Sequence, residues 1–161
     1  MHTTGLIREA TESDISDIVR INNHWVEKGD LKLKLELSSL AERMIEYENY
    51  FVYEIEDKVV GYVSIVPNPQ KEDSEWFLAR VNDYDPKTAL IIHQIAIEKG
   101  LQKRGIGHLL YSFIFERYPN RMIYVAIEQS NNDSLEFHRK QGFTFVTNIE
   151  DNRGIYRKDS T

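Results

Sequence analysis

The sequence predicts an α/β fold in a single domain, residues 1–161. Runs of β-branched and aromatic residues, which favour strands, alternate along the chain with segments whose apolar residues recur at helical spacing. A chain of 161 residues with 41% hydrophobic content can bury a core without metals or disulfides. No linker or internal repeat divides the sequence. We therefore expect one mixed sheet with helices packed on it.

The first third of the chain is predicted to hold a short strand and two helices. Residues 5–8 favour a strand, and residues 11–14 place a hydroxyl and an acid three positions apart, which is typical of a helix cap. The apolar residues that follow at helical spacing are Ile15, Ile18, Val19, Trp25 and Val26. Asn22 interrupts this stripe at the middle turn. Ser39 and Glu42 repeat the capping pattern and predict a second, shorter helix.

The middle of the chain combines three predicted strands with a long polar stretch. Residues 50–55 and 59–66 are rich in β-branched and aromatic residues and predict an antiparallel hairpin. Residues 68–87 are polar and acidic, which is typical of a loop that walls a ligand site and equally of a surface excursion with its own small apolar cluster. Residues 90–97 are almost continuously apolar, which indicates the central strand of the sheet.

The last third begins with a helix whose apolar face repeats until Pro119 ends it. The residues of that face are Ile106, Leu109, Leu110, Phe113 and Ile114. The remaining predicted elements are a strand at 122–127, a helix at 132–141, and strands at 143–146 and 155–157. Gly142 is expected to cap the helix before it.

Composition limits the partners and the compartment. The 20 Lys and Arg against 26 Asp and Glu give a net charge of -6, whose field repels nucleic acid and anionic membranes and suits a cationic substrate. There is no cysteine, no apolar run long enough to cross a bilayer and no N-terminal pattern of a secretory signal. We therefore expect a cytoplasmic protein that contacts neither nucleic acid nor membrane.

Residues 98–107 carry the most informative pattern, a glycine-containing loop between a buried strand and an amphipathic helix. Its glycines allow the backbone to approach an anion closely, and the first amides of the following helix have no partners within the helix. Lys99, Lys103 and Arg104 add positive charge. This arrangement predicts a phosphate-binding loop.

Two familiar phosphate loops do not match. Gly100 and Gly105 have the spacing of a P-loop, but Ile106 and Gly107 stand where that motif needs Lys and a hydroxyl residue. A dinucleotide fingerprint would need a third glycine where Leu110 stands, and its glycines would follow the strand directly. A Rossmann-like oxidoreductase is therefore the less favoured interpretation.

The loop resembles the pyrophosphate signature of the GNAT acetyltransferase superfamily, in which Gln or Arg, two residues, Gly, one residue, and Gly or Ala follow one another. The matching positions are Gln102, Gly105 and Gly107. A later motif of the family is matched at Asn131, Ser134, Phe137, His138, Gly142 and Phe143. With the order of strands and helices, the resemblance covers nearly the whole chain.

The resemblance implies a mostly antiparallel central sheet with helices on both faces and a splayed central strand pair. It also implies an acetyl-CoA-dependent N-acetyltransferase, which passes an acetyl group to an amine of a small molecule or peptide by direct attack on the thioester. The residues that would bind the coenzyme are Ile95, Ala96, Ile97, Gln102, Lys103, Arg104, Gly105, Ile106, Gly107, Asn131 and Ser134. No metal is implied.

The chemistry needs a proton acceptor for the amine and a donor for the leaving thiolate. His138 stands where the family usually has a tyrosine that protonates the sulfur, and imidazole titrates near neutrality, so His138 is the candidate acid. His93 is the titratable residue within the predicted central strand and is the candidate base. Because the tyrosine is replaced, a non-catalytic acyl-CoA-binding sensor remains an alternative, and a homodimer is compatible with either.

Overall fold

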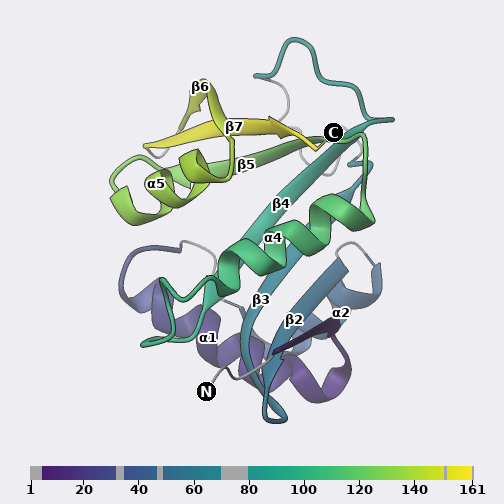
Figure 1. Cartoon of the computed structure of the whole chain (residues 1–161), viewed down its shortest axis with the longest axis vertical. Helices are drawn as coiled ribbons and strands as arrows, with labels where there is room; N and C mark the ends of the chain where they lie inside the picture. Colours follow the sequence, from purple (N-terminus) through teal and green to yellow (C-terminus); the bar gives the residue numbers. More distant parts are fainter. Residues whose placement is uncertain (1–4, 32–34, 47–48, 70–79, 151, 161) are drawn as a thin grey trace. The chain divides into compact units, whose positions relative to one another are not determined.

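The computed structural model describes residues 5–31, 35–46, 49–69, 80–150 and 152–160. Within these residues, seven strands form one sheet in the order β1-β2-β3-β4-β5-β7-β6 (Figure 1). The strands are β1 (Leu6–Glu9), β2 (Asn49–Ile55), β3 (Lys58–Pro67), β4 (Ala89–Ile97), β5 (Met122–Glu128), β6 (Thr144–Ile149) and β7 (Arg153–Asp159). The helices are the 3-10 turn η1 (Glu12–Asp14), α1 (Ile15–Glu27), α2 (Leu37–Glu46), α4 (Ile106–Arg117) and α5 (Asn132–Lys140). The sheet is mostly antiparallel, which confirms the predicted α/β fold class.

The chain divides into two compact units by its internal contacts. The first comprises Met1–Ile65 and Gln94–Glu116, and the second comprises Val66–His93 and Arg117–Thr161. Strands β3 and β4 contribute residues to both units. The predicted organisation as one domain over residues 1–161 stays a prediction.

An ion-pair network holds the start of the first unit. The Arg8 guanidinium donates to both carboxylate oxygens of buried Asp14, at 2.7 and 3.0 Å, and its Nε donates to Glu54 on β2 at 3.3 Å. The Thr11 amide also donates to Asp14, at 2.8 Å, as the predicted cap requires. The hydrogen bond from Arg8 lowers the pKa of Asp14, against the opposing effect of burial. This network links β1 to β2 and to the start of α1.

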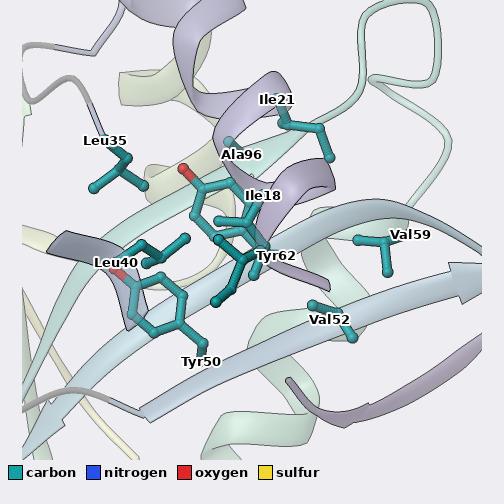
Figure 2. Close-up of a cluster of buried hydrophobic side chains, with 10 residues drawn as sticks. Ile18, Ile21, Leu35, Leu40, Tyr50, Val52, Val59, Tyr62 and Ala96 are labelled. Atoms are coloured by element: carbon teal, nitrogen blue, oxygen red, sulfur yellow. The ribbon is translucent and has the colours of Figure 1, made fainter. Parts of the chain in front are cut away.

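The core of the first unit lies between α1, α2 and one face of β2 and β3. Figure 2 shows Ile18 and Leu40 gathered with Tyr50 and Tyr62 in this cluster. Its buried members are Ile15, Ile18, Ile21, Leu35, Leu40, Tyr50, Val52, Val59, Tyr62 and Ala96. The stripe predicted for the first helix supplies two of them, Ile15 and Ile18, because residues at helical spacing share one face of α1.

Helix α4 packs on the other face of the same strands. The Phe113 ring of α4 contacts Phe51 of β2, with centroids 5.3 Å apart. Phe51 lies between Tyr50 and Val52 in sequence, and successive strand residues point to opposite faces. Helices therefore cover both faces of the sheet in this unit, as the resemblance implied.

Local signals predicted the hairpin well and the second helix less well. β2 and β3 pair antiparallel, with Glu56 and Asp57 in the left-handed region at the turn (φ 51° and 64°). Helix α2 begins at Leu37, so the capping role predicted for Ser39 is wrong. The Ser39 hydroxyl donates instead to the Glu36 carbonyl at 3.1 Å, inside the first turn.

The second unit is built on β7, which pairs antiparallel with both β5 and β6. Its buried cluster consists of Val81, Ala89, Ile91, Tyr124, Ile149 and Ile155. Helix α5 starts at its cap, Asn131, and the chain leaves it through Gly142 with φ 95°. The predicted helix and its glycine stop are confirmed.

Strand β4 is the fourth of the seven strands, which confirms its predicted central place. Its parallel ladder with β5 begins at the pair Ala89 and Met122 and ends at the pair Ile92 and Val125. β4 continues to Ile97, but the described pairing with β5 ends at Ile92, so residues 93–97 of β4 are not part of this ladder. The predicted splay of the central strand pair stays a prediction.

Replacing Asp14 with Asn is expected to lower the free energy of unfolding at pH 7 by about 1–3 kcal/mol, because the Arg8 guanidinium loses a charged acceptor. The folded-state pKa of Asp14 is below its unfolded value, so its contribution is present at neutral pH and disappears as pH falls through the folded pKa. Urea denaturation of both proteins at pH 7 and in acid measures this difference. Glu136→Gln, which breaks an exposed pair with Arg139, is the control; equal effects of the two substitutions at pH 7 would contradict the prediction.

Candidate functional site: the loop between β4 and α4

The predicted phosphate loop connects β4 to α4 and turns through three left-handed residues. Gly100 and Gly105 have φ of 88° and 86°, and Lys103 has φ of 62°. A Cβ at either glycine would meet nothing within 4 Å, so the backbone conformation and not crowding is what favours glycine there. The Gly100 amide donates to Gln102 Oε1 at 3.0 Å, which folds the signature glutamine back onto its own loop.

The loop ends at a helix start with the properties of an anion site. The Leu109 amide donates to the Gly105 carbonyl at 3.0 Å, so the amides of Ile106 and Gly107 belong to the first turn, where an α-helix has no internal acceptors. Ile106 is buried and anchors this turn, while Lys103 and Arg104 are exposed. Amides, helix dipole and cations together favour a phosphate at this position.

An ion-pair cluster precedes the loop at Glu98. Its carboxylate accepts from Arg20 of α1 at 2.5 Å and lies 3.3 Å from the Lys58 ammonium. Burial opposes ionisation of Glu98, but these two hydrogen bonds outweigh it and lower the pKa. Glu98 is therefore a paired carboxylate and is poorly suited to accept a proton.

The three β4 residues expected to bind coenzyme lie directly before Glu98. Ala96 is buried in the core of the first unit, and Ile95 and Ile97 are half-buried. The Ile97 carbonyl accepts a hydrogen bond from the indole N–H of Trp25 at 2.7 Å. The Ile97 carbonyl is therefore already bonded within the protein, which bears on the expectation that the Ile97 backbone contacts the coenzyme.

A buried polar network that the sequence did not predict joins α1 to β4. Gln94 Oε1 accepts from the Tyr62 hydroxyl at 2.8 Å and from Asn22 Nδ2 at 3.1 Å. Asn22 Oδ1 in turn accepts from the Leu35 amide at 2.9 Å. The interruption of the apolar stripe at Asn22 was the available signal, because a buried amide needs partners.

In the second unit, Asn131 and Ser134 form the cap of α5. The Ser134 amide donates to Asn131 Oδ1 at 3.1 Å, so the structural role of Asn131 is established. Contact of either residue with coenzyme stays a prediction. The loop residues belong to the first unit, and Asn131, Ser134, His93 and His138 belong to the second.

His138 is enclosed in α5 with only 2% of its surface exposed. Its Nδ1 lies 2.8 Å from the Ser134 carbonyl, which can only accept, so Nδ1 carries a proton in this bond. The Phe137 and Phe143 rings contact it edge-on at 5.1 and 5.3 Å. Burial lowers the pKa of His138 to about 4, although the bond to Ser134 opposes the shift. The ring is therefore neutral at pH 7, which limits it as an acid.

His93 lies on β4, at the position directly after the ladder with β5 ends. Its side chain is half-buried, in contrast to the four fully buried residues before it, so it is placed where the strand changes environment. Its role as a base stays a prediction.

Residues 68–87, which we expect to form a wall of the site for the acceptor amine, are described only in part, since residues 70–79 lie outside the described residues. In the described part, the Asp83 carboxylate accepts from Arg157 of β7 at 2.7 and 2.8 Å. Arg80 pairs with Glu150 at 2.8 Å. Two of the charges in this stretch are thus bound to the second unit's own residues.

The described part of the chain contains neither a grouping of metal ligands nor a helix that could span a membrane. No three His, Asp or Glu side chains there are grouped so as to hold a metal ion. None of the described helices has the length and apolarity needed to cross a membrane.

The fold is that of an α/β protein with a glycine-containing loop before α4, and comparison with known proteins gives its family. The sequence model described as the acetyltransferase (GNAT) family matches residues 18–143. This chain therefore belongs to the GNAT acetyltransferase family. A comparison with curated protein sequences finds no match.

Solved structures share the fold at low sequence identity. The N-acetyltransferase of Staphylococcus aureus Mu50 is 17% identical, with 98% of this chain and 99% of that chain covered and a TM-score of 0.73. The ribosomal-protein-alanine N-acetyltransferase of Brucella melitensis is 22% identical, with 96% and 99% covered and a TM-score of 0.69. The phosphinothricin acetyltransferase of Sinorhizobium meliloti, in complex with acetyl-CoA, is 17% identical, with 97% and 88% covered and a TM-score of 0.71.

The His138 imidazole is expected to titrate with a pKa of about 4, because its burial disfavours the charged ring. Since the unfolded chain binds this proton at higher pH, the shift makes the folded state lose stability as pH falls from about 6.5 toward 4. A two-dimensional NMR titration of the ring nitrogens measures the pKa, with exposed His108 as the internal control. A pKa near 6.5 for His138 would contradict the enclosed geometry.

Proposed function

We propose that this protein is an acetyl-CoA-dependent N-acetyltransferase that binds the coenzyme pyrophosphate at the loop between β4 and α4. The observation that carries the proposal is the loop geometry: left-handed Gly100, Lys103 and Gly105 lead into the first turn of α4. A pyrophosphate there receives backbone hydrogen bonds and the favourable helix dipole. The family assignment supports acetyl transfer in general.

The residues predicted to bind the coenzyme contribute three kinds of group: backbone amides, cationic side chains and a side chain that shapes the loop. The backbone amides of Gly105, Ile106 and Gly107 serve the pyrophosphate, with the exposed side chains of Lys103 and Arg104 adding charge. Gln102 shapes the loop through its bond to Gly100. The backbone of Ile95 and Ile97 is proposed for the pantetheine arm, whereas the Ala96 carbonyl lies on the β3 side of the strand, near Gly61. Asn131 and Ser134 in the second unit stay predicted coenzyme contacts.

The proposed reaction is direct attack of an unprotonated amine on the thioester carbonyl. The attack forms the C–N bond and an oxyanion, which a backbone N–H aimed at that oxygen stabilises. Collapse of this intermediate breaks the C–S bond and releases coenzyme A as a thiolate. The amine nitrogen gives up one proton and the thiolate takes one, so the products are an amide and free coenzyme A.

His93 and His138 remain the candidates for the two proton transfers, but the environment of each residue suits its proposed role to a different degree. A base must accept a proton at neutral pH, which imidazole can do, and His93 lies where β4 leaves its ladder with β5. An acid at His138 would have to release its Nδ1 proton and break the bond to the Ser134 carbonyl. The low pKa of His138 thus favours a role in holding α5 over a role as the acid.

The acceptor is proposed to be an amine of a small molecule or peptide in the cytoplasm. Both kinds of name occur among proteins of the same fold, one a ribosomal-protein-alanine N-acetyltransferase and one a phosphinothricin acetyltransferase. The net charge of -6 suits a cationic acceptor. Assembly as a homodimer stays a prediction.

A non-catalytic acyl-CoA sensor is the second candidate, because the histidine in place of the family's acid is buried and neutral. Incubation with acetyl-CoA and a broad panel of amines separates the two candidates. Release of free coenzyme A with formation of an acetylated amine supports the enzyme, and coenzyme binding without turnover across the panel supports the sensor.

Gly105→Val is expected to weaken acetyl-CoA binding at least tenfold, because the branched side chain strains the loop and occupies the space beside the amides. Gly29→Val is the matched control, since Gly29 has nearly the same φ of 85° and equally open surroundings. Both substitutions should cost about 1–2 kcal/mol of stability for the left-handed backbone. Calorimetric titration with acetyl-CoA, coenzyme A and NAD measures the affinities. Unchanged affinity of Gly105→Val, or a preference of the unaltered protein for NAD, would contradict the assignment.

A further inference from the structure

Trp25 links the last turn of α1 to the last residue of β4, although 72 positions separate the two in sequence. The indole ring is half-buried against the core of the first unit, and its N–H donates to the Ile97 carbonyl at 2.7 Å. An indole nitrogen is a donor only, so the direction of this bond is fixed.

The bond completes a clamp on one peptide group. The carbonyl of Ile97 and the N–H of Glu98 belong to the same planar unit and point in opposite directions. The Glu98 N–H donates to the Val60 carbonyl of β3 at 2.8 Å, and the Ile97 carbonyl accepts from Trp25 on the other side. Rotation of this peptide group would break one bond or both, so its orientation is fixed.

The direction of these two bonds also identifies the edge of β4 at which the Trp25 indole lies. Because the Glu98 N–H points to β3, the Ile97 carbonyl points to the edge of β4 that faces away from β3. Backbone groups of alternate residues share one edge of a strand, so those of Ile95 and the N–H of Ile97 lie on this same edge. Trp25 thus fills one acceptor position on an edge whose other groups belong to Ile95 and Ile97.

Both ends of the phosphate loop are held close to this clamp. A Cβ added at Gly61 of β3 would lie 2.9 Å from Ile97 Cδ1 and 3.4 Å from Ile106 Cγ2. The last residue of β4 and the first residue of α4 therefore approach each other over Gly61. Glu98, between them, is tied to Arg20 and Lys58. The path of residues 98–105 starts from the clamped peptide group.

We propose that Trp25 is a positioning residue for the coenzyme. Its indole N–H holds the Ile97 carbonyl, which leaves the Ile97 N–H and the backbone of Ile95 to bind the amide groups of the pantetheine arm, and it sets the start of the phosphate loop. This inference rests on the proposed function. Backbone groups and a loop that are fixed before the ligand arrives bind it without the cost of ordering.

Trp25→Phe tests the proposal because it removes the N–H donor and keeps an aromatic ring. Loss of one hydrogen bond of ordinary strength is expected to weaken acetyl-CoA binding by about three- to tenfold in calorimetric titration. Val19→Ala is the matched control, since Val19 is another partly buried residue of α1 packed on the same core. Val19→Ala should bind acetyl-CoA within about twofold of the affinity of the unaltered protein, because Val19 shares no hydrogen-bond partner with the coenzyme site.

A spectroscopic readout separates positioning from packing. The sequence contains two tryptophans, so the indole N–H signal that disappears in Trp25→Phe belongs to Trp25. This signal is expected to shift on addition of acetyl-CoA and to saturate with the calorimetric affinity. If the unaltered protein binds acetyl-CoA but Trp25→Phe binds as well as Val19→Ala, or the indole signal does not move, the role of Trp25 is overturned and the proposed function stands. If the unaltered protein does not bind acetyl-CoA, both are overturned.

Discussion

The attachment of α1 to β4 is the constraint on which the candidate site depends. Asn22 donates to Gln94 within the core, and Trp25 donates to the Ile97 carbonyl at the strand end. Arg20 pairs with Glu98 at the first position of the loop. Buried polar groups are costly unless they are paired, so these contacts specify how the helix lies on the strand more narrowly than apolar packing would. These contacts fix the position at which the loop begins.

Local charge at the loop is opposite to the charge of the whole chain. The protein carries a net charge of -6, yet the loop presents Lys103 and Arg104 to solvent beside a helix N-terminus. The acidic residue next to it, Glu98, is neutralised by Arg20 and Lys58 and adds little repulsion. An anion close to the loop therefore experiences the cations and amides, since solvent screens distant charges.

Burial gives the two candidate histidines different chemical properties. His138 lies among aromatic rings with its Nδ1 proton bound to the Ser134 carbonyl, and its pKa of about 4 keeps it neutral at pH 7. The bond and the ring contacts hold the last turn of α5 against Phe143. His93 stands where β4 changes from fully buried to alternating exposure. Matching a family motif identified His138, but its environment decides what it can donate.

The sequence by itself determined the features that depend on neighbouring residues. These are the cap at Thr11 and Asp14, the hairpin, the central strand, and the glycines of the loop before α4, because each is a local backbone or periodicity effect. It misplaced the start of α2, where the Ser39 hydroxyl bonds within the helix. Only the tertiary structure decided the enclosure of His138 and the bonds of Trp25 and Gln94. Trp25 meets Ile97 across 72 positions, and no local pattern encodes which distant groups the folded core brings into contact.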